Sequence, residues 1–330
     1  MKYFLGVDGG GSKTLAVVSD ERGRIVGRGY GGCGNHQLGP ESAKANIRAA
    51  VDEALASANV SRVDVAYAVY GLAGADREED FRILRPMMAG LGLGSHDIVC
   101  DTVIGLRAGT RQPDGIALVC GSGTNCYGIN KQGASFQCGG FGYAYGDFGG
   151  GGELAVEAFR AAIRAWEGRG EPTLLTEAVP AALGYASVEA MFHDFLDHDA
   201  NIPRDLVKVL FEVADRDETA KAILRRQGVE LGLSAEATIR RLGMEGDRFN
   251  VVLVGSVLTR GDSRYVMPYI EAAVRAAAPE CSLRVLTIEP AGGALLLAMD
   301  RASFGIGPEV YDNLAQALSV QAFQQGGAEE

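Results

Sequence analysis

The sequence predicts an α/β protein of two domains, and three observations lead to this prediction. The chain has 330 residues. One typical domain has roughly 100 to 200 residues. Short apolar runs that alternate with polar residues, as in strands, are interspersed with segments of helical periodicity. Because the order strand, glycine-rich turn, strand begins each half of the chain, we expect a repeat at the level of domains.

The first half is predicted to start with three strands joined by short turns and to continue with alternating helices and strands. In its first helical segment, the apolar residues Ile47, Val51 and Leu55 recur at helical spacing. Pro86 is expected to kink the next helix. The predicted strands cover 3–8, 14–20, 24–30, 63–70 and 96–101. The predicted helices cover 41–58, 81–91 and 102–108.

The second half is predicted to repeat the three-strand opening and to add a large helical region. The turn-like sequence R-Q-P-D-G at 111–115 marks the boundary. We predict an N-terminal domain 1–112 and a C-terminal domain 113–305, with a C-terminal helix within about 306–320 packing back onto the first domain. The predicted strands cover 115–120, 125–130, 134–137, 248–255 and 282–286. Helical sequence covers 153–243, 263–278, 292–302 and 309–318, and the tail Q-Q-G-G-A-E-E is expected to be disordered.

Composition and charge restrict the classes of partner. Hydrophobic residues make up 47% of the chain and charged residues 22%, as in folded globular proteins. The 31 Lys and Arg against 42 Asp and Glu give a net charge of -11, which opposes binding to a nucleic acid or an anionic membrane. There is no basic leader followed by an apolar core, and no apolar run of membrane-spanning length. We expect a cytoplasmic protein that binds a small molecule, with the oligomeric state open and a homodimer as one option.

The stretch G6-V-D-G-G-G-S-K-T14 has the composition of a phosphate-binding loop. A Walker loop is excluded because Ser12 displaces Lys13 by one position and a strand follows where a helix is required. The consecutive glycines 9–11 between two strands also exclude a dinucleotide fingerprint. The remaining possibilities are a hairpin whose backbone N–H groups converge on a phosphate and a glycine-rich hairpin without a ligand.

A second glycine-rich turn favours the first of these possibilities. The sequence L-V-C-G-S-G-T-N-C places Gly121, Ser122, Gly123 and Thr124 between two predicted strands, at the same point of the repeated pattern. Two such hairpins, facing each other across a cleft, would hold a polyphosphate from both sides.

A set of motifs in a fixed order connects these turns to a known family. The motifs are G-V-D-G-G-G-S-K-T at 6–14, G-N-H at 34–36, C-D-T at 100–102, G-S-G-T-N-C at 121–126, C-G-G-F-G-Y-A-Y-G-D at 138–147, V-L-V-G-S-V at 252–257 and E-P-A-G-G-A-L-L-L-A at 289–298. With them the chain resembles the sugar kinases of the actin-like ATPase superfamily, specifically the N-acetylglucosamine kinase branch. This branch shares the BadF/BadG-type ATPase family with activating ATPases of radical acyl-CoA enzymes. The resemblance implies two actin-like, ribonuclease H-like α/β domains that flank a nucleotide and sugar cleft.

The resemblance also implies ATP and Mg²⁺ as cofactors and assigns a catalytic base. It identifies Asp101, in C-D-T, as the base that accepts the proton of the attacking hydroxyl. An alternative role for Asp101 is an N-cap for a helix that starts at Thr102. Asp8, at the end of the first strand, is expected to hold Mg²⁺ through water.

The nucleotide is expected to bind along the two turns and at the strand V-L-V-G. Gly255 would let the adenosine lie against the backbone, or it is simply a turn residue between strand and helix. Lys13 and Arg260 are either phosphate neutralisers or solvated surface charges. The expected nucleotide ligands are Asp8, Gly9, Gly10, Gly11, Ser12, Lys13, Thr14, Gly121, Ser122, Gly123, Gly255 and Ser256.

The resemblance places a second group of residues around the sugar, including any N-acetyl group. Asn35 is a sugar ligand in this interpretation and a left-handed turn residue in the alternative. His36 is expected to pack or to orient, and Tyr143 and Tyr145 are either site residues or ordinary core residues. The expected sugar ligands are Asn35, Asp101, Thr124, Asn125, Gly140, Phe141, Gly142, Tyr143, Ala144 and Asp147.

The function implied is ATP-dependent phosphorylation of the 6-hydroxyl of an amino sugar, foremost N-acetylglucosamine. Glucosamine and N-acetylmuramic acid remain alternatives, because Phe148 stands where family members usually carry an acidic residue. A different class, an activator ATPase with an Fe–S cluster, would need cysteine ligands such as Cys120, Cys126 and Cys138. The six cysteines include no C-x-x-C pair, so we expect reduced thiols.

Overall fold

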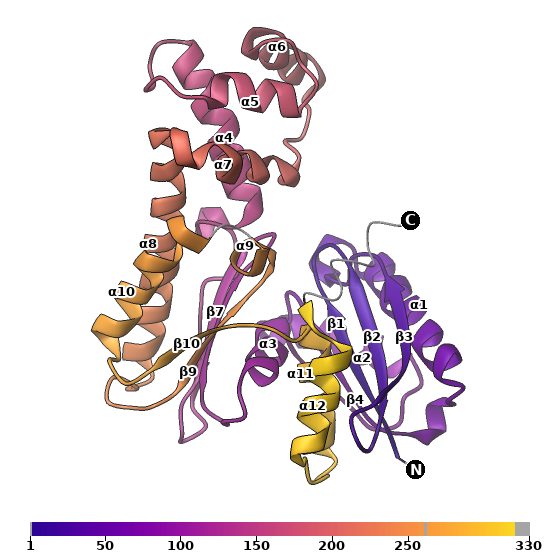
Figure 1. Ribbon diagram of the computed structural model, residues 1–330. Helices are drawn as coiled ribbons and strands as arrows, with labels where there is room; N and C mark the ends of the chain where they lie inside the picture. Colours follow the sequence, from indigo (N-terminus) through magenta and orange to yellow (C-terminus); the bar gives the residue numbers. More distant parts are fainter. Residues whose placement is uncertain (1, 261–262, 321–330) are drawn as a thin grey trace. The chain divides into compact units, whose positions relative to one another are not determined.

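The computed structural model describes residues 2–260 and 263–320, which form two compact units. Unit 1 combines the chain up to Ala117 with the chain from Arg284 onward, and unit 2 comprises Leu118–Leu283. In Figure 1 the indigo and yellow ends of the chain together make unit 1, whereas unit 2 carries the magenta and orange segments. The expected disordered tail lies outside the described residues.

The sheet of unit 1 has the strand order β3-β2-β1-β4-β5. Its strands are β1 (Tyr3–Gly9), β2 (Thr14–Asp20), β3 (Ile25–Gly31), β4 (Val65–Leu72) and β5 (His96–Cys100). The first three strands pair antiparallel, whereas β4 pairs parallel with β1 and β5 parallel with β4. Parallel pairing brings the carboxyl ends of β1, β4 and β5 to one edge of the sheet, where Asp8 and Cys100 lie.

Helices cover both faces of this sheet. Along β1 the side chains alternate, so that Leu5 and Val7 join one apolar cluster and Phe4 joins another. The first cluster contains residues of α1 (Pro40–Ala58) and α2 (Glu78–Ala89). The second contains residues of α3 (Asp101–Gly109), α11 (Pro290–Arg301) and α12 (Pro308–Ala317). The C-terminal helices are therefore part of the core of unit 1 (Figure 1).

The sheet of unit 2 has the order β8-β7-β6-β9-β10, which matches unit 1 strand for strand. Its strands are β6 (Gly115–Cys120), β7 (Thr124–Ile129), β8 (Ser135–Cys138), β9 (Asn250–Val254) and β10 (Ser282–Val285). This shared order confirms the predicted repeat of strand, glycine-rich turn and strand, and with it the predicted α/β class.

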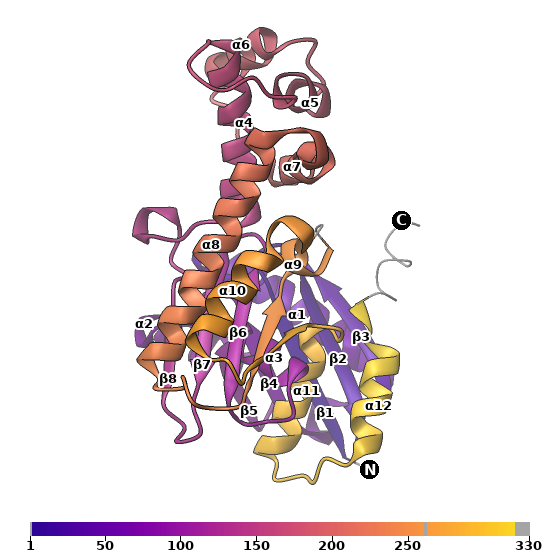
Figure 2. The ribbon, with the colours of Figure 1, turned by 60° about the vertical axis from the view of Figure 1, so that its left-hand side comes forward.

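Unit 2 adds a long helix and a helical extension. Helix α8 (Glu218–Arg241) runs along α10 (Met267–Ala277) beside the sheet, and the other helices of the extension gather near its N-terminal end (Figure 2). The extension contains α4 (Gly151–Trp166), α5 (Leu175–Ala182), α6 (Val188–His198) and α7 (Val207–Val213). The short α9 (Ser256–Arg260) follows β9. Among the described residues, no helix is long and apolar enough to cross a membrane.

Prolines explain where the predicted helix starts were wrong. Periodicity alone predicted a helix from 263, but a short 3-10 turn at Ser263–Tyr265 precedes α10, which has Pro268 in its first turn. Helices α1, α11 and α12 likewise start at Pro40, Pro290 and Pro308. Proline suits the first helical position because its fixed φ is already helical and its missing N–H has no partner there.

Candidate active site

The glycine-rich turn between β1 and β2 is fixed by the segment that leads to Asn35. Within the turn, the Gly10 N–H donates to the Lys13 carbonyl oxygen over 2.9 Å. The Gly34 N–H donates to the Gly10 carbonyl oxygen over 2.9 Å, and the buried Thr14 hydroxyl donates to the Gly32 carbonyl oxygen over 2.8 Å. The first predicted nucleotide turn and the predicted sugar ligand Asn35 are therefore joined through the backbone.

Three carboxyl groups lie beside this turn, at the edge where the parallel strands end. Burial and the neighbouring charges of Asp101 and Glu289 raise the pKa of Asp8 to about 7, and Lys13 opposes this effect. Asp8 belongs to the end of β1, Asp101 follows β5, and Glu289 precedes α11. The structure thus brings the predicted metal-binding residue and the predicted base together.

Asp101 starts helix α3 itself, so it is not the N-cap of a helix that starts at Thr102. The N-cap position is occupied by Cys100. The Cys100 thiol donates toward two carboxylates, over 3.2 Å to Asp76 Oδ1 and 3.3 Å to Asp101 Oδ1. Burial raises the pKa of Asp101, and the Cys100 thiol partly offsets this. A raised proton affinity suits a group that must accept a proton.

Asn35 caps a short 3-10 helix, His36–Leu38, and its Oδ1 accepts the Gln37 N–H over 2.9 Å. Its backbone is extended, with φ -79° and ψ 113°, so the left-handed turn considered for it is wrong. His36 is only 4% exposed, and its Nε2 lies 3.3 Å from Asp80 Oδ1.

Asp80 is the buried anchor of this loop. Both of its oxygens bind Arg77, which together with Gln37 holds the pKa of Asp80 down to about 2 despite burial. The sequence did not reveal this anchor, because Asp80 lies 44 residues beyond His36. The capping pattern from Arg77 to Asp80 was the available signal.

The second glycine-rich turn is supported by backbone from the start of α4. The Gly151 N–H donates to the Gly121 carbonyl oxygen over 2.8 Å, and the Gly152 N–H to the Ser122 carbonyl oxygen over 3.2 Å. A side chain on Gly150 would overlap the Cα of Gly123. Gly150 in F-G-G-G-G-E is therefore needed for the close approach of two backbones.

Gly255 also has a structural reason to be glycine. Its φ is +96°, and a Cβ at this position would overlap the Cys120 carbonyl group. This geometry accounts for the glycine as a turn residue between β9 and α9, the alternative considered for it. A role in nucleotide binding remains a prediction, as for Ser256.

A single carboxylate shapes the loop between β8 and α4. Asp147 Oδ2 accepts the N–H groups of Gly140, Phe141 and Gly142 over 3.0, 2.7 and 2.5 Å. Asp147 Oδ2 is thus occupied by hydrogen bonds within its own loop, and Oδ1 is the oxygen that can accept a hydrogen bond from a ligand. The loop containing the predicted sugar ligands is consequently held in one shape before any sugar binds.

The aromatic residues of this loop face outward. Tyr143 is 57% and Tyr145 81% exposed, so the interpretation as core residues is wrong, and Phe141 is exposed as well. Phe148, in contrast, is buried, and the guanidinium carbon of Arg226 lies 3.9 Å from its ring centroid. At the position where the resemblance led us to expect an acidic residue, this chain therefore has a buried ring stacked by an arginine.

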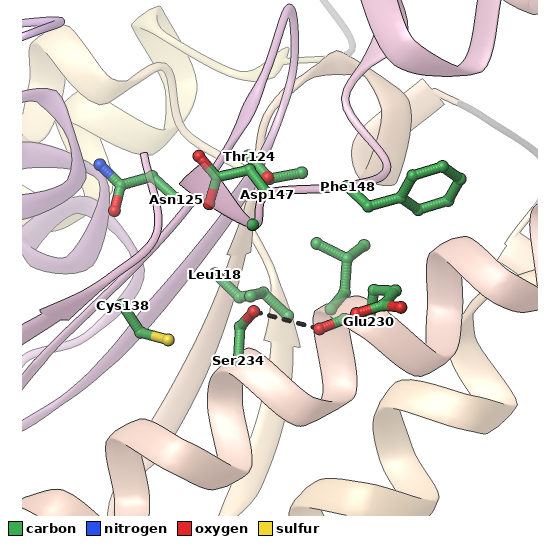
Figure 3. A pocket seen from close by; sticks show the side chains of 10 residues that line it. Leu118, Thr124, Asn125, Cys138, Asp147, Phe148, Glu230 and Ser234 are labelled. Atoms are coloured by element: carbon green, nitrogen blue, oxygen red, sulfur yellow. Dashed lines mark hydrogen bonds between the residues drawn. The ribbon is translucent and has the colours of Figure 1, made fainter. Parts of the chain in front are cut away.

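A small pocket in unit 2 brings together three of the predicted sugar ligands, Thr124, Asn125 and Asp147 (Figure 3). It has room for about one water molecule, with a volume of ≈ 20 Å³. Seven residues that were not among the expected sugar ligands complete it: Leu118, Cys138, Gly146, Phe148, Glu230, Leu231 and Ser234. The remaining predicted ligands of the loop do not line it: Gly140, Phe141, Gly142, Tyr143 and Ala144.

The cysteines are free thiols. Cys120 and Cys126 are fully buried, and burial raises the pKa of each thiol to about 12. Fe–S clusters bind thiolates, a form that burial disfavours at both positions.

Comparison with known proteins agrees with this architecture. Over 265 residues the chain is 31% identical to an N-acetylmuramic acid/N-acetylglucosamine kinase of Clostridium acetobutylicum, covering 78% of this chain and 86% of that protein. Over 316 residues it is 27% identical to an N-acetyl-D-glucosamine kinase of Dictyostelium discoideum, covering 91% and 98%.

A solved structure confirms the predicted fold class. It belongs to a Chromobacterium violaceum protein proposed to be an N-acetylglucosamine kinase. It has a TM-score of 0.72 at 22% identity and covers 90% of this chain and 99% of that one. The model of the BadF/BadG/BcrA/BcrD ATPase family matches residues 5–298, and the chain belongs to this family.

Proposed function

We propose that this protein is an ATP-dependent amino-sugar kinase that transfers the γ-phosphate to the 6-hydroxyl of N-acetylglucosamine. The observation that carries the proposal is the grouping of Asp8 and Asp101 beside the Gly9–Thr14 turn, in a chain related to amino-sugar kinases. Phosphoryl transfer requires these parts: donors for the phosphates, carboxylates near a metal ion, and an acceptor for the hydroxyl proton.

Asp101 is the proposed base. Its carboxylate accepts the proton of the 6-hydroxyl as that oxygen attacks the γ-phosphorus, and the bond to the leaving ADP breaks. Burial and the neighbouring Asp76 charge raise its pKa, which strengthens it as an acceptor. The Cys100 thiol, donating to Asp101 Oδ1, holds the carboxylate in place.

Both glycine-rich turns are proposed to bind ATP through backbone N–H groups. In unit 1 these groups lie within Gly9 to Thr14, and in unit 2 within Gly121 to Gly123. The N–H groups of Gly10 and Gly121 already donate within their own turns, to the carbonyl oxygens of Lys13 and Gly123, so the other N–H groups are the proposed donors.

Asp8 offers the oxygen ligand that Mg²⁺ prefers. Its pKa is raised by burial and by the neighbouring charges of Asp101 and Glu289, and a bound cation would offset these charges. When bound, Mg²⁺ would neutralise charge on the phosphates. Among residues 2–260 and 263–320, no cluster of three metal-binding side chains occurs, so Asp8 is proposed to act through water.

The sugar is proposed to contact Asn35 in unit 1 and the Asp147 loop in unit 2. The three N–H bonds to Asp147 Oδ2 keep that loop in shape, and Oδ1 is left for a sugar hydroxyl. Thr124 and Asn125, at the start of β7, extend the same surface. A cytoplasmic location and a homodimer remain part of this proposal.

A coupled ADP-release assay with a panel of sugars tests the function. The panel is N-acetylglucosamine, glucosamine, N-acetylmuramic acid, glucose and no sugar, each with Mg²⁺–ATP. We expect sugar-dependent ADP release that is fastest with N-acetylglucosamine, with phosphate on the 6-oxygen by NMR. ADP release that is the same with and without every sugar would overturn the proposal.

An Fe–S activator ATPase is the competing function. Anaerobically purified protein is expected to be colourless and free of iron, because the buried Cys120 and Cys126 disfavour the thiolate form. A brown, iron-containing dimer would instead support the activator.

A further inference from the structure

Helix α8 contributes a carboxylate to the predicted sugar pocket that the proposed function does not use. Glu230 and Ser234, one turn apart, line this pocket opposite Thr124 and Asp147 (Figure 3). The Ser234 hydroxyl donates to the Glu230 carbonyl oxygen over 3.1 Å, a bond within the helix that leaves the Glu230 carboxylate available. In the part of the chain that the structure describes, this carboxylate makes no hydrogen bond and no ion pair.

The position of Glu230 relative to the Asp147 loop is fixed by its neighbours on α8. Gln227 Nε2 donates to the Gly149 carbonyl oxygen over 2.8 Å, and both groups are buried. Arg226 stacks on the ring of Phe148. One face of α8 therefore binds the backbone and the ring that follow Asp147 directly, and Glu230 is the next residue on that face.

The charge of the pocket follows from its lining. It contains two carboxylates, Asp147 and Glu230, and no Lys, Arg or His. Asp147 is partly compensated by three backbone N–H groups, whereas Glu230 has no such compensation. With a volume of ≈ 20 Å³, the pocket holds about one water, so at most one layer of water separates Glu230 from the predicted sugar ligands.

We propose that Glu230 is a specificity-determining residue that selects amino sugars by charge. Its carboxylate favours a sugar with a protonated free amine and disfavours one with a carboxylate, such as the lactyl ether of N-acetylmuramic acid. The reason is that an unpaired charge in a partly desolvated pocket attracts a cation and repels an anion far more than in bulk water. This inference rests on the proposed function.

The test compares Glu230→Gln with the wild type on three substrates at pH 7: glucosamine, N-acetylglucosamine and N-acetylmuramic acid. The ratio of kcat/KM for glucosamine to that for N-acetylglucosamine should fall by about tenfold, a typical effect of one charged contact. The ratio for N-acetylmuramic acid to N-acetylglucosamine should rise. Glu230→Lys should reverse the order of the two charged sugars, which a loss of packing alone does not produce.

Glu218→Gln is the matched control, because it removes the same charge from the exposed start of the same helix, away from the pocket. Its substrate ratios should equal those of the wild type. Unchanged ratios in both Glu230 variants would overturn the inference while leaving the kinase proposal intact. Calorimetric titration of the wild type with each sugar distinguishes failure of the kinase proposal from failure of the inference about Glu230. If the wild type neither binds nor phosphorylates any amino sugar, the proposed function fails, and the inference fails with it.

Discussion

The two glycine-rich turns occupy the same place in two sheets of the same strand order, yet their surroundings differ. The turn of unit 1 lies beside charged side chains, with Asp8 at its start and Asp101 and Glu289 nearby. The turn of unit 2 is supported mainly by backbone, because Gly150 and Gly151 lie close to Gly121 and Gly123, and the carboxylate of Glu153 lies beside Gly150. In the proposed mechanism the two turns therefore differ in role: the turn of unit 1 lies beside the groups proposed to accept a proton and to hold a cation, whereas the turn of unit 2 is proposed to contribute shape.

The largest expected effect separates chemistry from binding in unit 1. Replacing Asp101 by Asn keeps the shape but removes the proton acceptor, so kcat should fall by roughly 10² to 10⁴. Sugar affinity, measured by calorimetry, should change little. Near-normal turnover in this variant would show that Asp101 is not the base. It would also contradict the proposal that unit 1 carries the group that accepts the proton.

The close approach of backbones predicts a steric effect in unit 2. A methyl group in Gly150→Ala would overlap Gly123, so the variant should lose about 2–3 kcal/mol of stability and bind ATP more weakly. Gly152→Ala is the control, because its Cβ would lie 3.6 Å from the nearest heavy atom, the Ser122 carbonyl oxygen, which is an ordinary contact. Thermal unfolding measures the loss of stability, and the KM for ATP measures the weaker ATP binding. Equal behaviour of the two variants would argue against a backbone-supported turn.

The Asp8 carboxylate of unit 1 predicts a pH dependence of stability. Because the pKa of Asp8 is raised from 3.8 to about 7, the folded state holds more protons than the unfolded state between these values. Stability should therefore fall as the pH rises from about 4 to about 7, by at most about 4 kcal/mol. Asp8→Asn should remove this dependence and be more stable at pH 8 in metal-free buffer. A wild type and variant with parallel stability curves would contradict the raised pKa.

The smallest effect concerns the anchor of the Asn35 loop. Asp80→Ala removes a buried carboxylate whose pKa is lowered to about 2, and should cost about 1–2 kcal/mol above pH 4. Since the pKa is depressed, this contribution is lost as the pH falls through about 2. The KM for the sugar should rise more than the KM for ATP. Glu79→Ala, an exposed neighbour in the same turn, serves as the control and should change neither.

Local pattern was sufficient for the strands, most helices and the two turns. Strand β2 has the predicted bounds 14–20, because alternation and the flanking turns are local signals. The predicted starts of helices were less accurate, because the spacing of apolar residues carries no information on the proline that fixes the first turn.

Partners that are distant in sequence were not predictable. Glu230 and Gln227 reach the Asp147 loop from 78 or more residues away, and only the tertiary fold brings α8 beneath it. The spacing of Arg226, Glu230 and Ser234 along one helix face was visible, but any solvated helix shows similar spacing.

The hydrogen bond from Gly34 to Gly10 has a thermodynamic consequence. It couples the turn that is proposed to bind the phosphates to the peptide that precedes Asn35, so ordering either one reduces the entropy still to be lost by the other. The two substrates should accordingly promote each other's affinity by the same factor, whichever arrives first.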